Sequence, residues 1–331
     1  MTTTIPPLLD RSGEPFPLQE VAQLWPLGGW RAVSPVAGGK NEHLRLASAD
    51  GVHYLRRSYR AKPAEELSAQ TGLMSLLRER GFPAPEVVPT TTGEDHASLH
   101  GRLWTVTRAM AGTPFDDRSP AHLRALGRTL ARYHGVVPDL PAPGAGSALV
   151  AELSRRTAEP GLDPVLRERT QRVVEELTGL LPDLPRLVVH GGARRGSLVF
   201  TGDEVTGVLD FDSAHPDARV LDLAVAAHDV GKVYTRLGAD DHKVALDLDR
   251  VREVLGAYTG VVRLTPGEVQ ALPLLLEAKR LKRLLGRLVR AGAGSPLSAN
   301  DHAKIDLEHS RLRWLDARRD ALAAACRHAL T

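Results

Sequence analysis

Residues 190–212 read HGGARRGSLVFTGDEVTGVLDFD, and this stretch decides how the rest of the chain is interpreted. It opens on His190-Gly191 at the end of an expected strand, and residues 197–200 have the apolar character of a second strand. Gly202-Asp203 is a turn signal, and the apolar run after it ends at Asp210-Phe211-Asp212. The stretch therefore predicts a strand, a glycine-rich loop and a hairpin that ends in two carboxylates.

The composition is that of an ordinary globular protein. Of its 331 residues, 25% are charged and 42% are hydrophobic, which allows a core large enough for two lobes. The net charge is only +3, and the few aromatic residues do not alternate with arginines, so we expect no nucleic-acid partner. With no long apolar run and no signal-like N-terminus, we expect a cytoplasmic protein without membrane contact. Cys326 is the only cysteine, which excludes an intrachain disulfide and a cysteine-based metal cluster.

The first third of the chain predicts an arm followed by a small antiparallel lobe. Residues 1–28 are proline-rich and form an arm with a short helix at residues 18–24. In residues 29–108, the Asp50-Gly51 turn separates two apolar runs and predicts a hairpin. A helix is expected at residues 64–80, where apolar residues recur at helical spacing.

The remaining residues, 109–331, predict a larger and mainly helical lobe that contains the catalytic-loop-like segment 188–212. Residues 109–112 are expected to form a hinge, and the site is expected in the cleft between the lobes. After a helix that contains Leu123, Leu126 and Leu130, further helices are expected at 149–158, 163–181, 220–237, 246–259, 267–293 and 299–328.

Six short motifs follow one another along the chain. They are Gly38-Gly39-Lys40-Asn41, Tyr54-Leu55-Arg56, Leu126-Gly127 with His134, His190-Gly191, Asp210-Phe211-Asp212, and Asp217 with Asp222-Leu223-Ala224. In this order they resemble the motifs of the aminoglycoside phosphotransferase and choline kinase superfamily. The resemblance implies an α+β, two-lobed protein-kinase-like fold, with a small antiparallel-sheet lobe and a larger helical lobe.

The resemblance also implies a site for ATP and Mg²⁺. It places the nucleotide near Gly38, Gly39, Lys40, Arg56, Ser197 and the hinge residue Met110. Asp210 takes the position of the carboxylate that holds Mg²⁺. Whether ATP and Mg²⁺ bind, and whether the protein is an enzyme, stays open because other catalytic positions differ.

Two positions of the catalytic loop depart from the family. The family's Asp is Gly192 here, and its Asn is Ser197. Gly192 cannot accept the proton of a substrate hydroxyl, a form of help that contributes about 10²–10⁴ in rate. Ser197 is shorter than Asn and neutral, so a second Mg²⁺ is not expected.

A further departure concerns the residue that holds the nucleotide phosphates. Arg56 stands where the family has Lys, which keeps the charge and allows bidentate contact with phosphate. The family's partner Glu corresponds to Gln70, although Glu65 or Glu66 could take its place.

The loop carries other candidates for catalysis. Arg194 and Arg195 could bind a phosphate, sulfate or carboxylate, or could simply face solvent. His190 could act as a base, although the resemblance implies a structural role for it. Asp212 could supply residual base function or support Asp210.

A basic stretch lies in the expected helix at 267–293. Its basic residues are Lys279, Arg280, Lys282, Arg283, Arg287 and Arg290. They could form a solvated helix face or a contact surface at 279–290 for a protein partner or an anionic ligand. If this stretch lines the substrate side of the cleft, its positive charge disfavours polycationic aminoglycosides and favours a neutral, anionic or peptide ligand.

Three functions follow from these observations. The missing Asp and Asn favour a pseudokinase that binds a small molecule, a peptide or a partner enzyme in the cleft. The chain is rich in Ala, Arg, Leu and Gly, which is typical of proteins encoded by GC-rich bacterial genomes and favours a role in biosynthesis. The alternative is an active ATP/Mg-dependent phosphotransferase on a small-molecule or peptide hydroxyl, since positioning and electrostatics dominate this reaction. A third is a repurposed site, such as a cyclase, lyase or adenylyl transferase, that uses Arg194, Arg195 and Asp210 differently.

Overall fold

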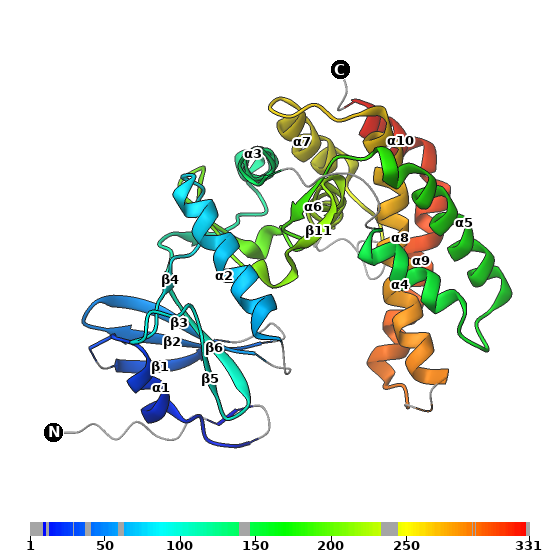
Figure 1. Cartoon of the computed structure of the whole chain (residues 1–331). Helices are drawn as coiled ribbons and strands as arrows, with labels where there is room; N and C mark the ends of the chain where they lie inside the picture. Colours follow the sequence, from blue (N-terminus) through cyan, green and yellow to red (C-terminus); the bar gives the residue numbers. More distant parts are fainter. Residues whose placement is uncertain are drawn as a thin grey trace. The chain divides into compact units, whose positions relative to one another are not determined.

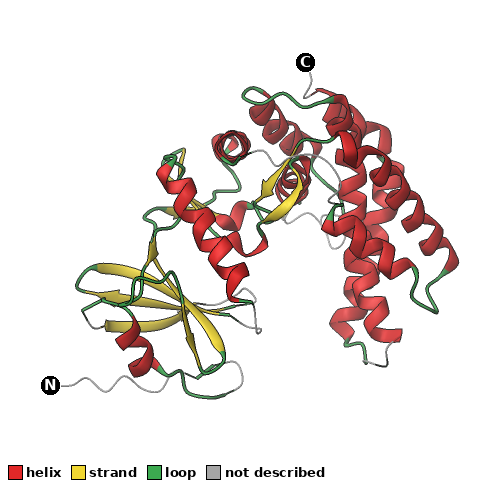
Figure 2. Cartoon of the chain, in the orientation of Figure 1, coloured by secondary structure: helices red, strands yellow, loops and turns green. Residues whose placement is uncertain are grey.

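The structure is a computed structural model, in which the chain forms two compact units (Figure 1). It describes residues 9–10, 13–28, 30–36, 41–58, 63–138, 146–232, 244–292, 294 and 296–328. The first unit consists of Met1–Thr113 and Thr206–Leu209, and the second of Pro114–Val205 and Asp210–Thr331. Most strands belong to the first unit and most helices to the second (Figure 2).

The first unit contains a six-stranded sheet in the order β1-β2-β3-β6-β4, with β5 also paired to β6. Every one of these pairs is antiparallel. The strands are β1 (Trp30–Val36), β2 (Glu42–Ser48), β3 (Gly51–Arg57), β4 (Val87–Val88), β5 (Ala97–Leu99) and β6 (Arg102–Arg108). The predicted turn joins β2 to β3, where Gly51 has a φ of 117°, a conformation that glycine adopts without strain.

Two helices belong to the first unit, α1 (Leu18–Leu24) and α2 (Ala64–Glu79). Val21 and Trp25 pack on the sheet residues Leu46, Leu55 and Trp104 to form a hydrophobic core. The burial of β2 alternates along the strand, as expected for a sheet with one face on a core. The apolar periodicity of residues 64–80 thus correctly predicts α2.

The second unit is mainly helical. Its helices are α3 (Pro120–Val136), α4 (Ala148–Thr157), α5 (Pro164–Leu180), α6 (Val220–Gly231), α7 (Leu248–Thr259), α8 (Pro266–Gly292), α9 (Ala299–Ala317) and α10 (Arg319–His328). Short 3₁₀ turns occur at Leu181–Asp183, Arg195–Ser197 and Phe211–Ser213. Helix α3 approaches α7 closely at Gly127, where a Cβ atom would lie 2.3 Å from the Val254 carbonyl oxygen. Glycine at 127 is therefore required by helix packing.

The predicted strand, loop and hairpin at residues 186–212 are present. Strand β8 (Arg186–Val189) pairs with β11 (His215–Ala218), and β9 (Leu198–Thr201) lies between β10 (Glu204–Val208) and β7 (Thr113–Pro114). The loop that leads from β8 to β9 and the turn after β10 carry the candidate catalytic residues.

The helix predicted over residues 299–328 is wrong in one respect, because it is two helices. Arg318 leaves the helical conformation with a φ of −125°, and its N–H bonds the Leu315 carbonyl oxygen, so α9 ends there and α10 begins. Helix α6 ends at Gly231 because Lys232 is extended, and the predicted residues 233–237 lie outside the described part of the chain. None of the helices described is both long and apolar enough to cross a membrane.

Candidate active site

The loop after β8 is held by a buried carboxylate from helix α6. Asp222 accepts hydrogen bonds from the backbone N–H groups of His190 at 2.8 Å and Gly191 at 2.7 Å. His134 Nε2 lies 3.2 Å from the same carboxylate, and its Nδ1 is 2.8 Å from the Tyr258 hydroxyl. Burial acts to raise the pKa of Asp222, but His134 and the charge and backbone of His190 lower it overall. Asp222 is therefore an ionised anchor for the loop.

The two glycines of the loop differ in what they require. Gly191 has a φ of 68°, and a Cβ there would lie 2.2 Å from the Ser213 carbonyl oxygen, so only glycine suits the position. At Gly192, a Cβ would lie 3.6 Å from His190 Nδ1 and 3.7 Å from the Asp210 carbonyl oxygen, which are ordinary contacts. The backbone at position 192 thus has room for a side chain and lies beside Asp210.

Asp210 is presented by a left-handed turn at the end of β10. Its φ and ψ are 66° and 57°, and the residue is exposed. Such a conformation is uncommon for residues other than glycine and is found at sites where a side chain must be held in a special direction. The next residue, Phe211, is buried and packs 4.7 Å from the His190 ring. Asp212 follows in the 3₁₀ turn and is half-buried.

His190 and Ser197 are both turned into the loop. His190 is 1% exposed, and its Nδ1 accepts the Gly192 N–H at 3.2 Å. The Ser197 hydroxyl accepts the Arg194 N–H at 2.8 Å and donates to the Arg194 carbonyl oxygen at 2.7 Å. These bonds stabilise the shape of the loop, and they engage the Ser197 hydroxyl where the family has an Asn.

The two loop arginines are not equivalent. Arg195 donates from its backbone N–H and from Nε to Asp229, each at 3.1 Å, and also pairs with Asp117. Two carboxylates thus surround its charge. Arg194 is exposed, and its charge is close enough to Lys279 and Arg283 to lower their pKa values. The structure therefore separates the pair that the sequence places side by side.

In the first unit, Arg56 lies on β3 and Gln70 on α2. Arg56 Nη1 donates to Gln70 Oε1 at 3.3 Å, so the contact expected for the family's Lys–Glu pair occurs here between Arg and Gln. Glu65 and Glu66 are exposed in the first turn of α2. Met110 is half-buried after β6, whereas Gly38, Gly39 and Lys40 lie outside the described residues.

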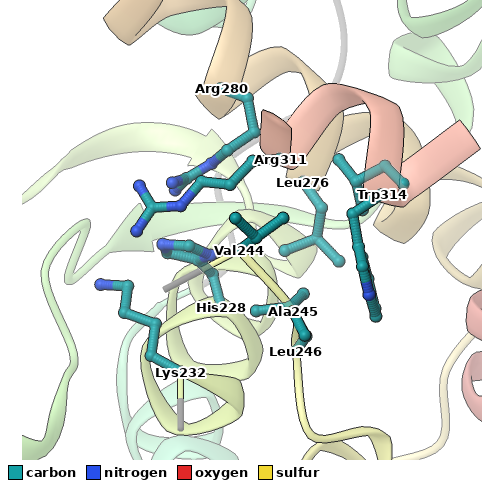
Figure 3. Close-up of a pocket in the computed structure, with 10 residues that line it drawn as sticks. His228, Lys232, Val244, Ala245, Leu246, Leu276, Arg280, Arg311 and Trp314 are labelled. Atoms are coloured by element: carbon teal, nitrogen blue, oxygen red, sulfur yellow. The ribbon is translucent and has the colours of Figure 1, made fainter. Parts of the chain in front are cut away.

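The second unit also contains a pocket that the sequence did not indicate (Figure 3). Part of its lining consists of the basic residues His228 of α6, Lys232 directly after α6, Arg280 of α8 and Arg311 of α9. Arg280 is buried and lies 3.3 Å from Glu308, so the interpretation of the basic stretch as a fully solvated face is wrong. The spacing of His228 on α6 and Lys232 directly after it, four residues apart, was the missed signal.

The comparisons with known proteins identify the family. A family model described as the phosphotransferase enzyme family matches residues 33–254. This chain belongs to that family. Two phosphotransferase relatives are named homoserine kinase, one from Methylobacillus flagellatus and one from Methylobacterium nodulans. The first is 30% identical to this chain, and the match covers 88% of this chain and 92% of the relative. The second is also 30% identical, and the match covers 80% of this chain and 82% of the relative.

Solved structures agree on the fold of this chain. An amicoumacin kinase in complex with AMP-PNP and Ca²⁺ has a TM-score of 0.71, with 17% identity and coverage of 91% of this chain and 92% of its own. The expected α+β, protein-kinase-like fold is confirmed.

The comparisons correct the expectation of a pseudokinase. That expectation depended on the missing Asp and Asn at positions 192 and 197. Relatives that match the phosphotransferase chain over most of its length are named for a kinase activity, which contradicts a protein without catalysis and supports the alternative of an active phosphotransferase. The loss of one proton acceptor removes a rate contribution without removing the positioning on which transfer mainly depends.

Proposed function

We propose that the protein is an ATP-dependent kinase that phosphorylates the hydroxyl group of a small molecule, homoserine or a close analogue. The observation that carries this proposal is the similarity to a protein named homoserine kinase over 88% of the chain. The geometry of the loop supports it, because Asp222 keeps the loop anchored although Gly192 lacks a carboxylate. We also expect the protein to act in the cytoplasm, where ATP is available.

In the proposed reaction, the acceptor oxygen forms a bond to the γ-phosphorus of ATP while the bond to the oxygen of ADP breaks. The transition state for this transfer is loose, so the acceptor need not be deprotonated early. The hydroxyl proton then passes to a phosphoryl oxygen and on to solvent. Gly192 takes no part in that step, and the contribution of the protein is to hold and orient the two substrates.

The residues fit a Mg²⁺ ion that arrives with the nucleotide. Mg²⁺ in kinases is held by one or two carboxylates together with phosphate oxygens. Asp210 is exposed and supplies one carboxylate. The part of the chain that the structure describes contains no group of three His, Cys, Asp or Glu side chains that could hold a metal without phosphates. When bound, the ion would neutralise negative charge on the phosphates.

Other site residues have proposed roles that follow from their contacts. We propose that Arg56, oriented by Gln70, binds the nucleotide phosphates. His190 and Ser197 are proposed to maintain the loop. A protein partner at 279–290 has less support, because Arg280 and Lys282 already pair with acidic residues of the same unit. A small molecule is therefore the acceptor class that we propose.

The test is phosphate transfer from γ-labelled ATP to L-homoserine, with L-serine, L-threonine and 3-aminopropanol as comparisons. The control is Asp210→Asn, which removes the charge while Asn still tolerates the left-handed conformation. We expect transfer by the wild type and a loss of about 10²–10³-fold or more in the variant. Absence of transfer to every acceptor tested, by a folded protein that binds ATP, would contradict the proposal.

A further inference from the structure

The basic pocket brings three cationic side chains to one place. Lys232 directly follows α6, Arg280 comes from α8 and Arg311 from α9, and His228 of α6 lies beside them with a pKa that burial lowers, so that it is neutral. Figure 3 shows their nitrogen-bearing ends turned to the same side, while Trp314, Leu246 and Leu276 line the other. A pocket with a cationic side and an apolar side is suited to a ligand with an anionic group on a short carbon chain.

Several donors in this pocket have no hydrogen-bond partner. Arg280 Nε and Nη2 and His228 Nε2 are buried without one among the residues that the structure describes. Arg280 is only 2% exposed and His228 only 5%. Because buried polar groups are normally paired, donors left open in a pocket indicate a ligand that accepts hydrogen bonds.

The carboxylates beside the pocket are shared between cations. Glu308 lies 3.3 Å from Arg280 and 2.9 Å from Arg311, so one carboxylate contacts two guanidinium groups. Asp229 is likewise shared, at 3.4 Å from Lys232 and 3.1 Å from Arg195 of the loop, which also pairs with Asp117. Neither carboxylate is therefore dedicated to a single cation of the pocket.

The protonation of these groups reflects burial and the repulsion between neighbouring cations. Burial, together with the charges of Arg283 and Arg311, lowers the pKa of Arg280 to about 9, although Glu308 acts in the opposite direction. Burial and nearby arginines lower the pKa of Lys232 to about 8 in spite of Asp229. A bound anion would relieve this repulsion and favour the charged forms.

The pocket is connected to the catalytic loop through one carboxylate. Asp229 accepts hydrogen bonds from Arg195 in the loop and from Lys232 in the pocket. Arg194, at the other side of the loop, acts electrostatically on Lys279 and Arg283 of α8. All of these residues belong to the second unit. A ligand in the pocket is therefore close to the loop at which the acceptor would react.

We infer that this pocket binds the carboxylate of the acceptor, and that the substrates are small hydroxy acids or hydroxy amino acids rather than simple amino alcohols. Its enclosed part has room for about one water-sized group, so only the carboxylate itself would enter it, and the remainder of the acceptor would lie in the open mouth. The inference rests on the proposed phosphotransferase function, since it assigns the recognition of that reaction's acceptor. Lys232, Arg280 and Arg311 would bind the carboxylate, and Trp314 would pack against its carbon chain.

The first experiment is calorimetric titration without ATP, so that binding is measured apart from catalysis. The ligands are L-homoserine, other small hydroxy acids, and 3-aminopropanol, which is homoserine without its carboxylate. Loss of a charge-assisted contact corresponds to about 10–100-fold in affinity. We expect that difference between homoserine and 3-aminopropanol, and the same loss of homoserine affinity in Lys232→Gln. Equal binding of both ligands, or binding of inorganic phosphate but of no carboxylate, would overturn the inference.

Matched variants separate recognition from folding. Arg290→Gln is the control, because Arg290 is an exposed cation of α8 that does not line the pocket and lies 3.7 Å from Asp301. Thermal denaturation shows whether each variant is folded, and Lys232→Arg should restore most of the lost affinity. In transfer assays, Lys232→Gln should raise KM for the acceptor and leave KM for ATP unchanged. An effect on both KM values, or equal effects of the Lys232 and Arg290 variants, would count against the pocket.

The two proposals fail in different ways. If homoserine binds in a Lys232-dependent manner but no phosphate is transferred, the carboxylate pocket stands and the kinase proposal fails. If phosphate is transferred to homoserine and 3-aminopropanol with equal kcat/KM, the kinase proposal stands and the pocket assignment fails.

Discussion

The catalytic loop and the basic pocket beside it differ in how they use charge. In the loop, the positions that hold Asp and Asn in the family hold Gly192 and Ser197 here. The charge of Arg195 is surrounded by Asp229 and Asp117. In the pocket, buried donors of Arg280 and His228 have no partner within the described residues. In the functions that we propose, the loop contributes mainly geometry, whereas the pocket contributes the electrostatic recognition of a substrate.

The scaffold of the loop is complete although its catalytic side chains differ from the family. Asp222 bonds two successive backbone N–H groups, and His134 and Tyr258 extend the network into α3 and α7. A loop that had lost its function would not need this buried and fully bonded carboxylate. The contrast between the loop and the pocket can be tested by removing Asp222, by restoring a carboxylate at position 192, or by removing positive charge from the pocket.

The largest effect is expected from Asp222→Ala, which removes the anchor of the loop. The substitution leaves two backbone N–H groups and His134 buried without their acceptor, at a cost of about 3–5 kcal/mol in the free energy of unfolding. Urea denaturation measures this cost, with the exposed Asp203→Ala as control. A loss below 1 kcal/mol would mean that the loop is held by other contacts.

The next effect is expected from Gly192→Asp, which restores a carboxylate to the loop. Position 192 accepts a Cβ at ordinary contact distances, so the backbone need not move. If transfer proceeds without a base, the new carboxylate should raise kcat by up to about 10²–10⁴. Steady-state kinetics with homoserine check this, and Gly192→Ala separates the carboxylate from the added methyl group. An unchanged kcat would show that proton removal does not limit the reaction.

Much of the fold was predictable from the sequence because local signals agreed with one another. The turn at Asp50-Gly51 and the apolar period of residues 64–80 correspond to a hairpin and to α2. The long prediction for 299–328 failed since nothing in its apolar pattern marks the break at Arg318. A helix can end where its neighbours require it, and periodicity does not report that.

The site was less predictable because charge in a sequence does not show where it is buried. Lys279 to Arg290 look like a solvated basic face, but Arg280 is buried against Glu308 of another helix. Gly192 was interpreted from the sequence as a missing base, yet the conclusion of inactivity did not follow. That step treated one contribution to the rate as if it were the whole reaction.

The third prediction concerns how the affinity of the pocket for a carboxylate depends on pH. Burial and neighbouring cations lower the pKa of Lys279 to about 7 and that of Lys232 to about 8. Both are protonated at pH 6 and largely neutral at pH 9. Lys232 lines the pocket and Lys279 acts on Arg280 through its charge, so affinity for a carboxylate is present at low pH and lost as Lys232 is neutralised at higher pH. The charged groups around them are Arg194, Asp222, Asp229, Arg280 and Arg283.

The measurement for this prediction is KM for homoserine between pH 6.5 and 9, which should rise by about 10-fold, the value of one charge-assisted contact. A bound anion favours the protonated lysines, so the rise begins above the pKa values of the free protein. KM for 3-aminopropanol is the control and should not follow the same curve. A parallel rise for both acceptors would place the titrating group outside the pocket.

The smallest effect is expected from Lys279→Met, which removes one cation from the repelling group. Lys279 is half-buried, and in the absence of an anion its charge is opposed by burial and by Arg283, Arg194 and Arg280. Replacement by an apolar side chain of similar length should stabilise the ligand-free protein by about 1 kcal/mol, while affinity for a carboxylate falls. Thermal denaturation with and without homoserine measures both, and Lys282→Met on the same helix is the control because Lys282 pairs with Glu152. A lower Tm for Lys279→Met would mean that the positive charges of the pocket are already balanced, and that the contrast with the loop is smaller than the ligand-free structure indicates.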